Sequence, residues 1–216
     1  MRHRLSSDHS WGAFVSVDGP GGAGKTTIVR HLAQLLAADG TDVHVTAEPS
    51  AGPIGTLAAE LTETVTGHAL ACLYTADRYH HAETEIRPLL REGRTVVSDR
   101  YLASGLVVQR FDEVDLTYLW TLNEHVHRPD LAVILDADPD VIAERLDDRG
   151  PHNRFQSSPR SSHAEVEFYR HAADIMVAAG FTVMRLDCSS QSAAQSALLI
   201  NDRLAGVVMA NRSVSR

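Results

Sequence analysis

The sequence predicts an α/β protein in which a five-stranded parallel sheet is flanked by helices. Short apolar runs alternate along the chain with longer segments of helical periodicity. The runs lack the two-residue alternation of a strand with one wet face, which is expected when both faces of a sheet are covered. Aspartates follow three of the runs, at Asp18, Asp99 and Asp136. Ligands bind at the carboxyl ends of strands in such sheets.

The predicted elements follow one another in regular alternation. The strands are expected at residues 13–17, 43–46, 95–98, 131–135 and 181–184. Helical segments are expected at about residues 26–40, 56–91, 102–127, 164–179 and 193–205, and Pro139 opens a further helix. Residues 150–162 are rich in Gly, Pro, Ser, Asn and Arg and predict a loop.

Length and composition indicate one globular domain. The 216 residues are 44% hydrophobic and 22% charged, which excludes disorder across the chain, and the net charge of −8 argues against nucleic acid as a partner. We expect a single domain at 11–209, with flexible tails at 1–10 and 210–216. No apolar run approaches the roughly 20 residues that span a bilayer, and the start lacks an apolar signal core, so a cytoplasmic protein without a membrane partner is expected.

A phosphate-binding loop is the strongest motif. Residues 19–26 read GPGGAGKT, which fits the pattern GxxxxGK[ST] between a predicted strand and a predicted helix. The backbone amides of such a loop and the helix N-terminus surround phosphate oxygens. Lys25, the one lysine of the chain, is expected to reach the β- and γ-phosphates. ATP is favoured over GTP, because the Asn-Lys-x-Asp motif that reads guanine needs a second lysine.

Three further features complete a site for phosphoryl transfer. The Thr26 hydroxyl and the Asp99 carboxylate are the oxygen ligands expected to hold Mg²⁺. Arg100 follows Asp99 directly and is a natural clamp for a phosphate. Arg149, Arg154 and Arg160 lie in or beside the predicted loop. We therefore predict a lid at about residues 149–162 that brings positive charge to the phosphates.

With these motifs in order, the chain resembles the thymidylate kinases. The matching segments are Asp18 to Thr27, Glu48-Pro49 with residues 52–55, Tyr74 to Arg78, Asp99 to Tyr101 with Ser104, and residues 131–155 with Tyr169. The resemblance implies a P-loop nucleoside monophosphate kinase fold with a short arginine-bearing lid. It also implies transfer of the γ-phosphoryl group of ATP to dTMP with Mg²⁺, and a homodimer.

The resemblance assigns roles to particular residues. It implies nucleotide contacts by Gly19, Gly21, Gly22, Ala23, Gly24, Lys25, Thr26, Thr27, Arg145 and Arg149. It implies acceptor contacts by Asp18, Glu48, Tyr74, Arg78, Arg100, Gly105, Val108, Gln109 and Tyr169. Tyr74 matches an aromatic that stacks on thymine, Arg78 an arginine that bonds a base carbonyl, and Arg100 the arginine that grips the acceptor phosphate. The catalytic group is then Lys25, Asp18, Arg100 and Arg154, with Arg154 as the lid arginine.

Two positions depart from the family pattern. Ala47 stands where an arginine usually helps to hold the acceptor phosphate, and Val108 stands where a tyrosine packs under the deoxyribose. The expected acceptor is therefore dTMP, with a modified nucleotide, a ribonucleotide or another small phosphate acceptor as the alternative. An ATP-dependent switch and a kinase fold kept only for binding are the remaining alternatives. Tyr74, Arg78 and the lid arginines argue against the first, and intact Lys25, Thr26 and Asp99 against the second.

Overall fold

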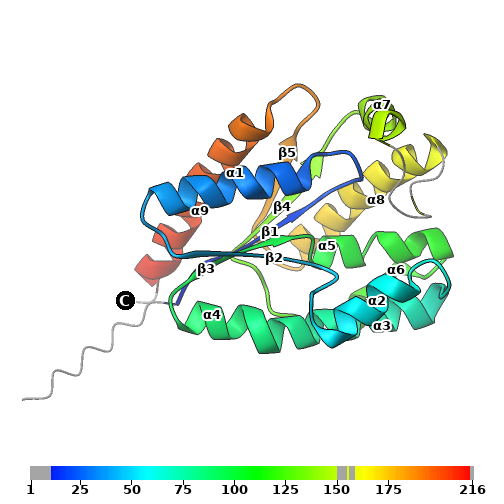
Figure 1. The fold of residues 1–216 in the computed structure, drawn as a ribbon, viewed down its shortest axis with the longest axis horizontal. Helices are drawn as coiled ribbons and strands as arrows, with labels where there is room; N and C mark the ends of the chain where they lie inside the picture. Colours follow the sequence, from blue (N-terminus) through cyan, green and yellow to red (C-terminus); the bar gives the residue numbers. More distant parts are fainter. Residues whose placement is uncertain (1–10, 150–154, 156–158, 215–216) are drawn as a thin grey trace, which may run out of the picture.

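A computed structural model describes residues 11–149, 155 and 159–214. Within them, five strands form one sheet in the order β2-β3-β1-β4-β5 (Figure 1). The strands are β1 (Phe14–Asp18), β2 (Val43–Ala47), β3 (Thr95–Asp99), β4 (Leu131–Asp136) and β5 (Val183–Asp187). Each neighbouring pair is parallel. The predicted α/β class, with a five-stranded parallel sheet flanked by helices, is confirmed.

Helices fill the connections between the strands. They are α1 (Lys25–Ala38), α2 (Pro53–Leu61), α3 (Gly67–His81), the π-helical turn η1 (Ala82–Ile86), α4 (Arg87–Arg91), α5 (Leu102–Gly105), the 3₁₀ turn η2 (Val108–Asp112), α6 (Leu116–Leu122), α7 (Pro139–Arg149), α8 (Pro159–Ala178) and α9 (Ala193–Val214). In the described part of the chain, none of them has the length and apolar character needed to cross a membrane.

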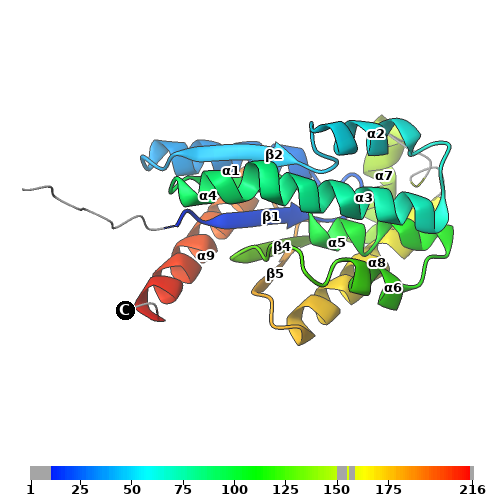
Figure 2. The same ribbon diagram turned by 90° about the horizontal axis from the view of Figure 1, so that it is seen from below.

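Two apolar clusters cover the two faces of the sheet. Val15 and Val17 of β1 point into one cluster, together with side chains of α1 and α9, and Phe14 points into the other, with side chains of α3, α4 and α5. This alternation follows from the pleat, which sends successive side chains to opposite faces. Figures 1 and 2 show α1 and α9 on one side of the sheet and α3 and α4 on the other. Helix α8 contributes to both clusters.

Strand order decides where the functional groups meet. Strand β1 lies between β3 and β4, and Val17 pairs with Asp99 in the β1–β3 register. The loop after β1 and the residues after β3 therefore start at the same edge of the sheet. Because all the strands are parallel, the polar residues at their carboxyl ends lie at this edge.

The last strand differs from its prediction. The apolar run at 181–184 suggested the strand, but β5 spans Val183–Asp187 and pairs residue by residue with β4 up to Asp136–Asp187. As an edge strand, β5 exposes alternate residues such as Arg185, so its apolar pattern is weak. Phe181 precedes the strand and packs against the Trp120 ring instead.

Two helix ends were also predicted wrongly. Helix α8 begins at Pro159 rather than about residue 164, and α9 continues to Val214 rather than ending near residue 205. The expected tail at 210–216 is therefore helical as far as Val214. Its last turns stay attached because Val207 is buried and the Asn211 amide donates to Oδ1 of Asp130 at 3.1 Å. The expected helical region 102–127 consists of the short segments α5, η2 and α6.

The packing of α1 on the sheet predicts a matched pair of stability effects. Leu32 is fully buried in the α1–α9 cluster, whereas the Leu198 side chain on α9 is about half exposed. We expect Leu32→Ala to lower the free energy of unfolding by about 2–5 kcal/mol, because it leaves a cavity. Leu198→Ala is expected to cost less than about 1 kcal/mol. Urea titrations followed by circular dichroism would measure both, and equal losses would contradict this account of the core.

Candidate active site

The glycine-rich loop connects β1 to α1. Gly19 has φ +152°, and a Cβ at this position would lie 2.8 Å from the Cβ of Leu135, so both backbone geometry and space require glycine there. Gly21 and Ala23 are buried, and Gly24 precedes the first turn of α1, which carries Lys25, Thr26 and Thr27. The loop lies at the N-terminus of a 14-residue helix, as the anion-binding motif requires.

Lys25 folds back over the loop. Its Nζ donates to the carbonyl oxygens of Gly19 at 2.8 Å and of Pro20 at 2.7 Å. Burial and the neighbouring charge of Arg100 lower the pKa of Lys25 to about 7, although Glu165, Asp99 and Asp18 act in the opposite direction. An incoming phosphate would provide the countercharge that favours the protonated amine.

Thr26 and Asp99 form the candidate magnesium pair. The Thr26 hydroxyl donates to Oδ2 of Asp99 at 2.6 Å, which brings a residue of α1 next to the last residue of β3. A hydroxyl and a carboxylate are hard oxygen ligands of the kind that Mg²⁺ prefers. The pair therefore fits the ion that the motif implies.

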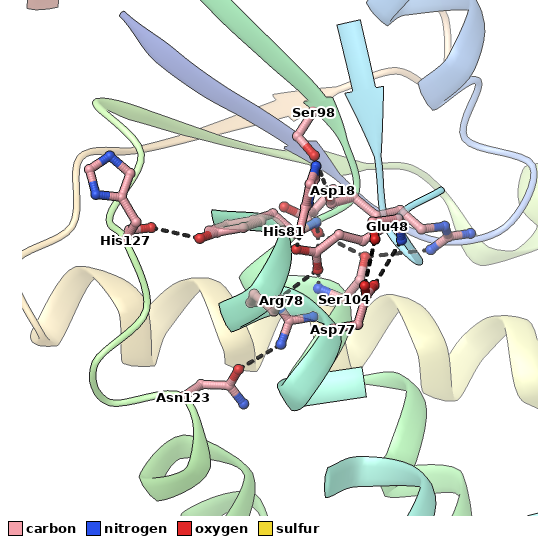
Figure 3. Close-up of polar contacts among 12 residues, drawn as sticks. Asp18, Glu48, Asp77, Arg78, His81, Ser98, Ser104, Asn123 and His127 are labelled. Atoms are coloured by element: carbon pink, nitrogen blue, oxygen red, sulfur yellow. Dashed lines mark hydrogen bonds and ion pairs between the residues drawn. The ribbon is translucent and has the colours of Figure 1, made fainter. Parts of the chain in front are cut away.

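Asp18, the last residue of β1, organises the start of α5 (Figure 3). Its Oδ1 accepts from the backbone N–H of Tyr101 at 2.8 Å, from the N–H of Ser104 at 3.0 Å and from the Ser104 hydroxyl at 2.8 Å. Oδ2 is buried, and no described residue donates to it. A buried carboxylate oxygen without a partner is costly, so it is a candidate position for a ligand group.

Arg100 adopts a strained backbone next to this carboxylate. Its φ is +73°, a left-handed value that costs a non-glycine residue about 1–3 kcal/mol. The backbone N–H donates to the Val17 carbonyl at 2.9 Å, and the Ser98 hydroxyl donates to the Arg100 carbonyl at 2.6 Å. The guanidinium lies 3.4 Å from the hydroxyl of Tyr169 on α8. The strain directs the side chain into a pocket rather than along the strand.

That pocket joins the predicted acceptor residues. Its lining consists of Glu48, Pro49, Tyr74, Arg78, Arg100, Ser104, Gly105, Val108, Gln109, Phe155 and Glu165. Arg100 and Glu165 lie at its P-loop side, since Glu165 also contacts the backbone of Gly21. The structure thus brings most of the predicted acceptor residues into one cavity, and Tyr169 contacts its Ser104.

Arg78 lines the pocket, and polar contacts fix its guanidinium in place (Figure 3). It is 2% exposed, and its Nε donates to Oε2 of Glu48 at 2.8 Å while Nη1 donates to Oδ1 of Asn123 at 2.6 Å. Its guanidinium also lies over the Tyr101 ring, 5.7 Å from the centroid. Gly105 permits this placement, because a Cβ there would lie 2.5 Å from Nη1 of Arg78.

The buried ring of His81 contacts Glu48. Nδ1 of His81 lies 3.4 Å from Oε1 of Glu48, and Nε2 of His81 lies 2.8 Å from the Thr46 hydroxyl. Burial by itself disfavours the charged ring, but the hydrogen bond to Glu48 and the charges of Glu48 and Glu85 outweigh it and raise the pKa of His81. The contact with His81 helps to hold Glu48, and through it Arg78, in place.

The remaining predicted residues differ in how the structure places them. Tyr74 and Val108 are half-buried in the pocket lining, and the Tyr74 hydroxyl lies 2.8 Å from that of Thr62. Arg145 of α7 flanks the P-loop: a Cβ on Gly22 would lie 3.5 Å from its Cβ, and its Nη2 donates to the Cys188 and Ser189 carbonyls at 3.3 Å. Arg154 and the Arg149 and Arg160 side chains lie outside the described residues, as does most of the predicted lid.

Two residues of the site escaped the sequence reasoning. Asn123 binds Arg78, but nothing in the local sequence distinguishes it from a loop asparagine. Glu165 lines the pocket and lies one helical turn before Tyr169, which was predicted. The spacing of four residues places both on one face of a helix and was the available signal.

The site combines a glycine-rich loop and its lysine with the Thr26–Asp99 pair and a separate pocket for an acceptor. This combination defines a phosphotransferase of the P-loop class. The family model described as "Thymidylate kinase" matches residues 17–194. A relative from Pyrobaculum calidifontis, "Probable thymidylate kinase", is 38% identical over 165 residues, covering 75% of this chain and 79% of the relative. A second, from Pyrobaculum aerophilum, is 37% identical over 147 residues, covering 67% and 74%. A "Thymidylate kinase" from Exiguobacterium is 32% identical over 164 residues, covering 72% and 77%.

The chain therefore belongs to the thymidylate kinase family. Its members are nucleoside monophosphate kinases that use ATP as the phosphate donor. The resemblance seen in the sequence is thereby confirmed, and so is the assignment to this class of enzyme.

Because Gly105 lies so close to Arg78, one added methyl group at position 105 is expected to lower the stability of the protein strongly. Because Glu48 and Asn123 hold the guanidinium, it has little freedom to move away, and Gly105→Ala is expected to cost about 1–3 kcal/mol of unfolding free energy. Gly206→Ala is the matched control: this glycine lies within α9 and its Cβ would meet open space, so stability should be unchanged or higher. Chemical denaturation would compare the two variants. Equal stability of Gly105→Ala and the parent would contradict the rigid placement of Arg78.

Proposed function

We propose that this enzyme transfers the γ-phosphoryl group of ATP to dTMP, giving ADP and dTDP, through the residues described above. The observation that carries the proposal is the acceptor pocket beside the P-loop, because one cavity is lined both by Arg100 and by Tyr74, Arg78 and Gln109. A nucleoside monophosphate has the matching polarity, with a planar base at one end and a dianionic phosphate at the other.

The part of the pocket lined by Tyr74, Arg78 and Gln109 suits a pyrimidine with carbonyl groups. Tyr74 offers an aromatic face, and base stacking on such a face contributes about 1–3 kcal/mol. The Arg78 guanidinium can only donate hydrogen bonds. It therefore favours a carbonyl oxygen of the base and disfavours the exocyclic amine of cytosine. Gln109 is 1% exposed and lines the same cavity, where its amide has both a donor and an acceptor to offer a base edge.

The part of the pocket lined by Arg100 suits phosphate. Arg100 would orient the acceptor phosphate toward the donor, and Lys25 would neutralise charge on the β- and γ-phosphates as the bond to the leaving ADP breaks. The acceptor phosphate is already ionised at neutral pH, so the transfer needs no strong general base. Catalysis would come from positioning and from charge stabilisation.

Thr26 and Asp99 would hold Mg²⁺. The ion, when bound, supplies further positive charge to the phosphates. Asp18 would meet the acceptor sugar or the hydrated metal through Oδ2, the oxygen that no described residue contacts. The catalytic role of Arg154, the nucleotide contacts of Arg145 and Arg149, the homodimer and the cytoplasmic location stay predictions.

A second acceptor is favoured by one specific observation. Val108 is half-buried in the pocket lining, and Ala47 ends β2 opposite Asp99 in the β2–β3 register, without a charge. A small side chain at position 108 leaves space for a 2′-hydroxyl, and a neutral residue at position 47 holds no phosphate. A ribonucleotide or a modified pyrimidine nucleotide is therefore the alternative acceptor.

Coupled measurement of ADP release tests the proposal directly. The acceptors would be dTMP, dUMP, UMP, CMP, dCMP, AMP and GMP, each with ATP and Mg²⁺, and dTMP is expected to give the highest kcat/KM. Lys25→Ala should lower kcat/KM by about 10²–10³ or more, since it removes the cation at the transferring phosphate. Arg30→Ala, which removes an exposed cation from the same helix, is the control and should have little effect.

Three results would contradict the proposed reaction. ATP hydrolysis that no acceptor stimulates would indicate a switch protein. ATP binding without any turnover would indicate a fold kept for binding. A ribonucleotide preferred over dTMP would indicate the alternative acceptor.

Val108→Tyr tests how the pocket treats the sugar. A tyrosine would fill the space beside the sugar and is expected to raise the preference for dUMP over UMP about tenfold, a pair that differs only in the 2′-hydroxyl. Val108→Ala enlarges the space and should not raise that preference. The ratio of kcat/KM for the two nucleotides gives the answer, and an unchanged ratio in Val108→Tyr would rule out position 108 as the sugar gate.

A further inference from the structure

A carboxylate of α8 reaches into the phosphate-binding loop. Oε2 of Glu165 accepts the backbone N–H of Gly21 at 3.0 Å, although the two residues are 144 positions apart. Glu165 is 5% exposed, and it lines the acceptor pocket together with Arg100. It therefore contacts both halves of the site, the loop for the donor and the cavity for the acceptor.

The surroundings of this carboxylate are those of a bound phosphate. An amide of the P-loop donates to it, Arg100 lines the same pocket, and the charge of the carboxylate is opposite to those of Lys25 and Arg100. These are the groups that bind substrate phosphates under the proposed function. A carboxylate and a phosphate are both oxyanions, so the same donors and cations satisfy either of them.

We propose that Glu165 is an internal competitor for substrate phosphate, which occupies a phosphate-binding N–H of the P-loop and must leave it when nucleotide binds. The inference rests on the proposed function, because it takes Gly21, Lys25 and Arg100 as phosphate ligands. Two anions cannot share these ligands without strong repulsion in a buried site. Part of the binding energy of the nucleotide is therefore spent on displacing the carboxylate.

Displacement of Glu165 has a consequence for the acceptor side. Tyr169 lies one turn further along α8, and its hydroxyl is 2.9 Å from the Ser104 hydroxyl and 3.4 Å from the Arg100 guanidinium. Tyr169 thus contacts Arg100 from the same helix that places the carboxylate of Glu165 in the pocket with it. When the carboxylate leaves, Arg100 loses an anionic neighbour and is available to a phosphate. Glu165 accordingly links occupation of the donor loop to the state of the acceptor arginine.

Glu165→Gln is the test, because it removes the charge and keeps the size and the accepting oxygen of the side chain. Isothermal titration would measure binding of a non-hydrolysable ATP analogue with Mg²⁺. We expect the analogue to bind about tenfold tighter to Glu165→Gln than to the parent. Glu167→Gln is the matched control, an exposed glutamate two residues along the same helix that pairs with Arg170. Its affinity for the analogue should equal that of the parent.

Thermal unfolding provides a second readout, because Glu165→Gln should lower the Tm without nucleotide but increase the rise in Tm that the analogue causes. In the empty enzyme, Glu165→Gln leaves Lys25 and Arg100 with less countercharge, so its Tm should fall, while the analogue should raise that Tm by more than it raises the parent's. Glu165→Asp keeps the charge but shortens the side chain, and it should bind the analogue with an affinity between those of the parent and Glu165→Gln. This variant also keeps the test possible if Glu165→Gln does not fold.

Equal or weaker binding of the analogue to Glu165→Gln would overturn the inference, since it would make the carboxylate neutral or helpful to the nucleotide. These titrations need no acceptor and no turnover. A failure of dTMP phosphorylation would therefore leave them interpretable, and a negative result for Glu165 would leave the proposed reaction intact.

Discussion

The rest of the structure depends on one constraint, which is to keep a group of buried charged side chains in place at the carboxyl edge of the sheet. Lys25 and Arg100 lie among the carboxylates of Asp18, Asp99 and Glu165, in a region where burial strongly disfavours unpaired charge. The parallel sheet makes this arrangement possible, because β1 and β3 are neighbours and end at the same edge. The apolar clusters on both faces keep these strands in register and keep water away from the charges.

Backbone N–H groups supply hydrogen bonds to these charges in addition to those from side chains. Two N–H groups at the start of α5 donate to Asp18, and this requires the chain to turn sharply after β3. The left-handed conformation of Arg100 makes that turn, at a cost of about 1–3 kcal/mol that the hydrogen bonds to Asp18 and Val17 offset. The strain is thus part of what points Arg100 into the acceptor pocket. On the far wall, the ion pair of Glu48 and Arg78 plays the corresponding role, supported by His81.

The sequence predicted the parts of this site that are local in the chain. The glycine-rich loop, Lys25, and the aspartates at strand ends all follow from patterns within a few residues, and so did the central strands. Contacts made across the fold were less accessible: Glu165 reaches Gly21 only because α8 packs beside the P-loop, and Asn123 reaches Arg78 only through the packing of α6 on α3. The strand β5 was misplaced because an edge strand is half polar, and the length of α9 depends on its packing against α1 rather than on its own sequence.

The balance of charge also limits how the site can accept phosphates. Among the described residues at the sheet edge, the carboxylates of Asp18, Asp99 and Glu165 outnumber the cations of Lys25 and Arg100. A donor triphosphate and an acceptor phosphate would add several more negative charges to the same small volume, which a low-dielectric site does not tolerate unaided. Under the proposed function, Mg²⁺ held by Thr26 and Asp99 would offset part of this charge. Negative charge must also leave, and Glu165 is the carboxylate whose hydrogen bond to the P-loop a phosphate is equipped to replace.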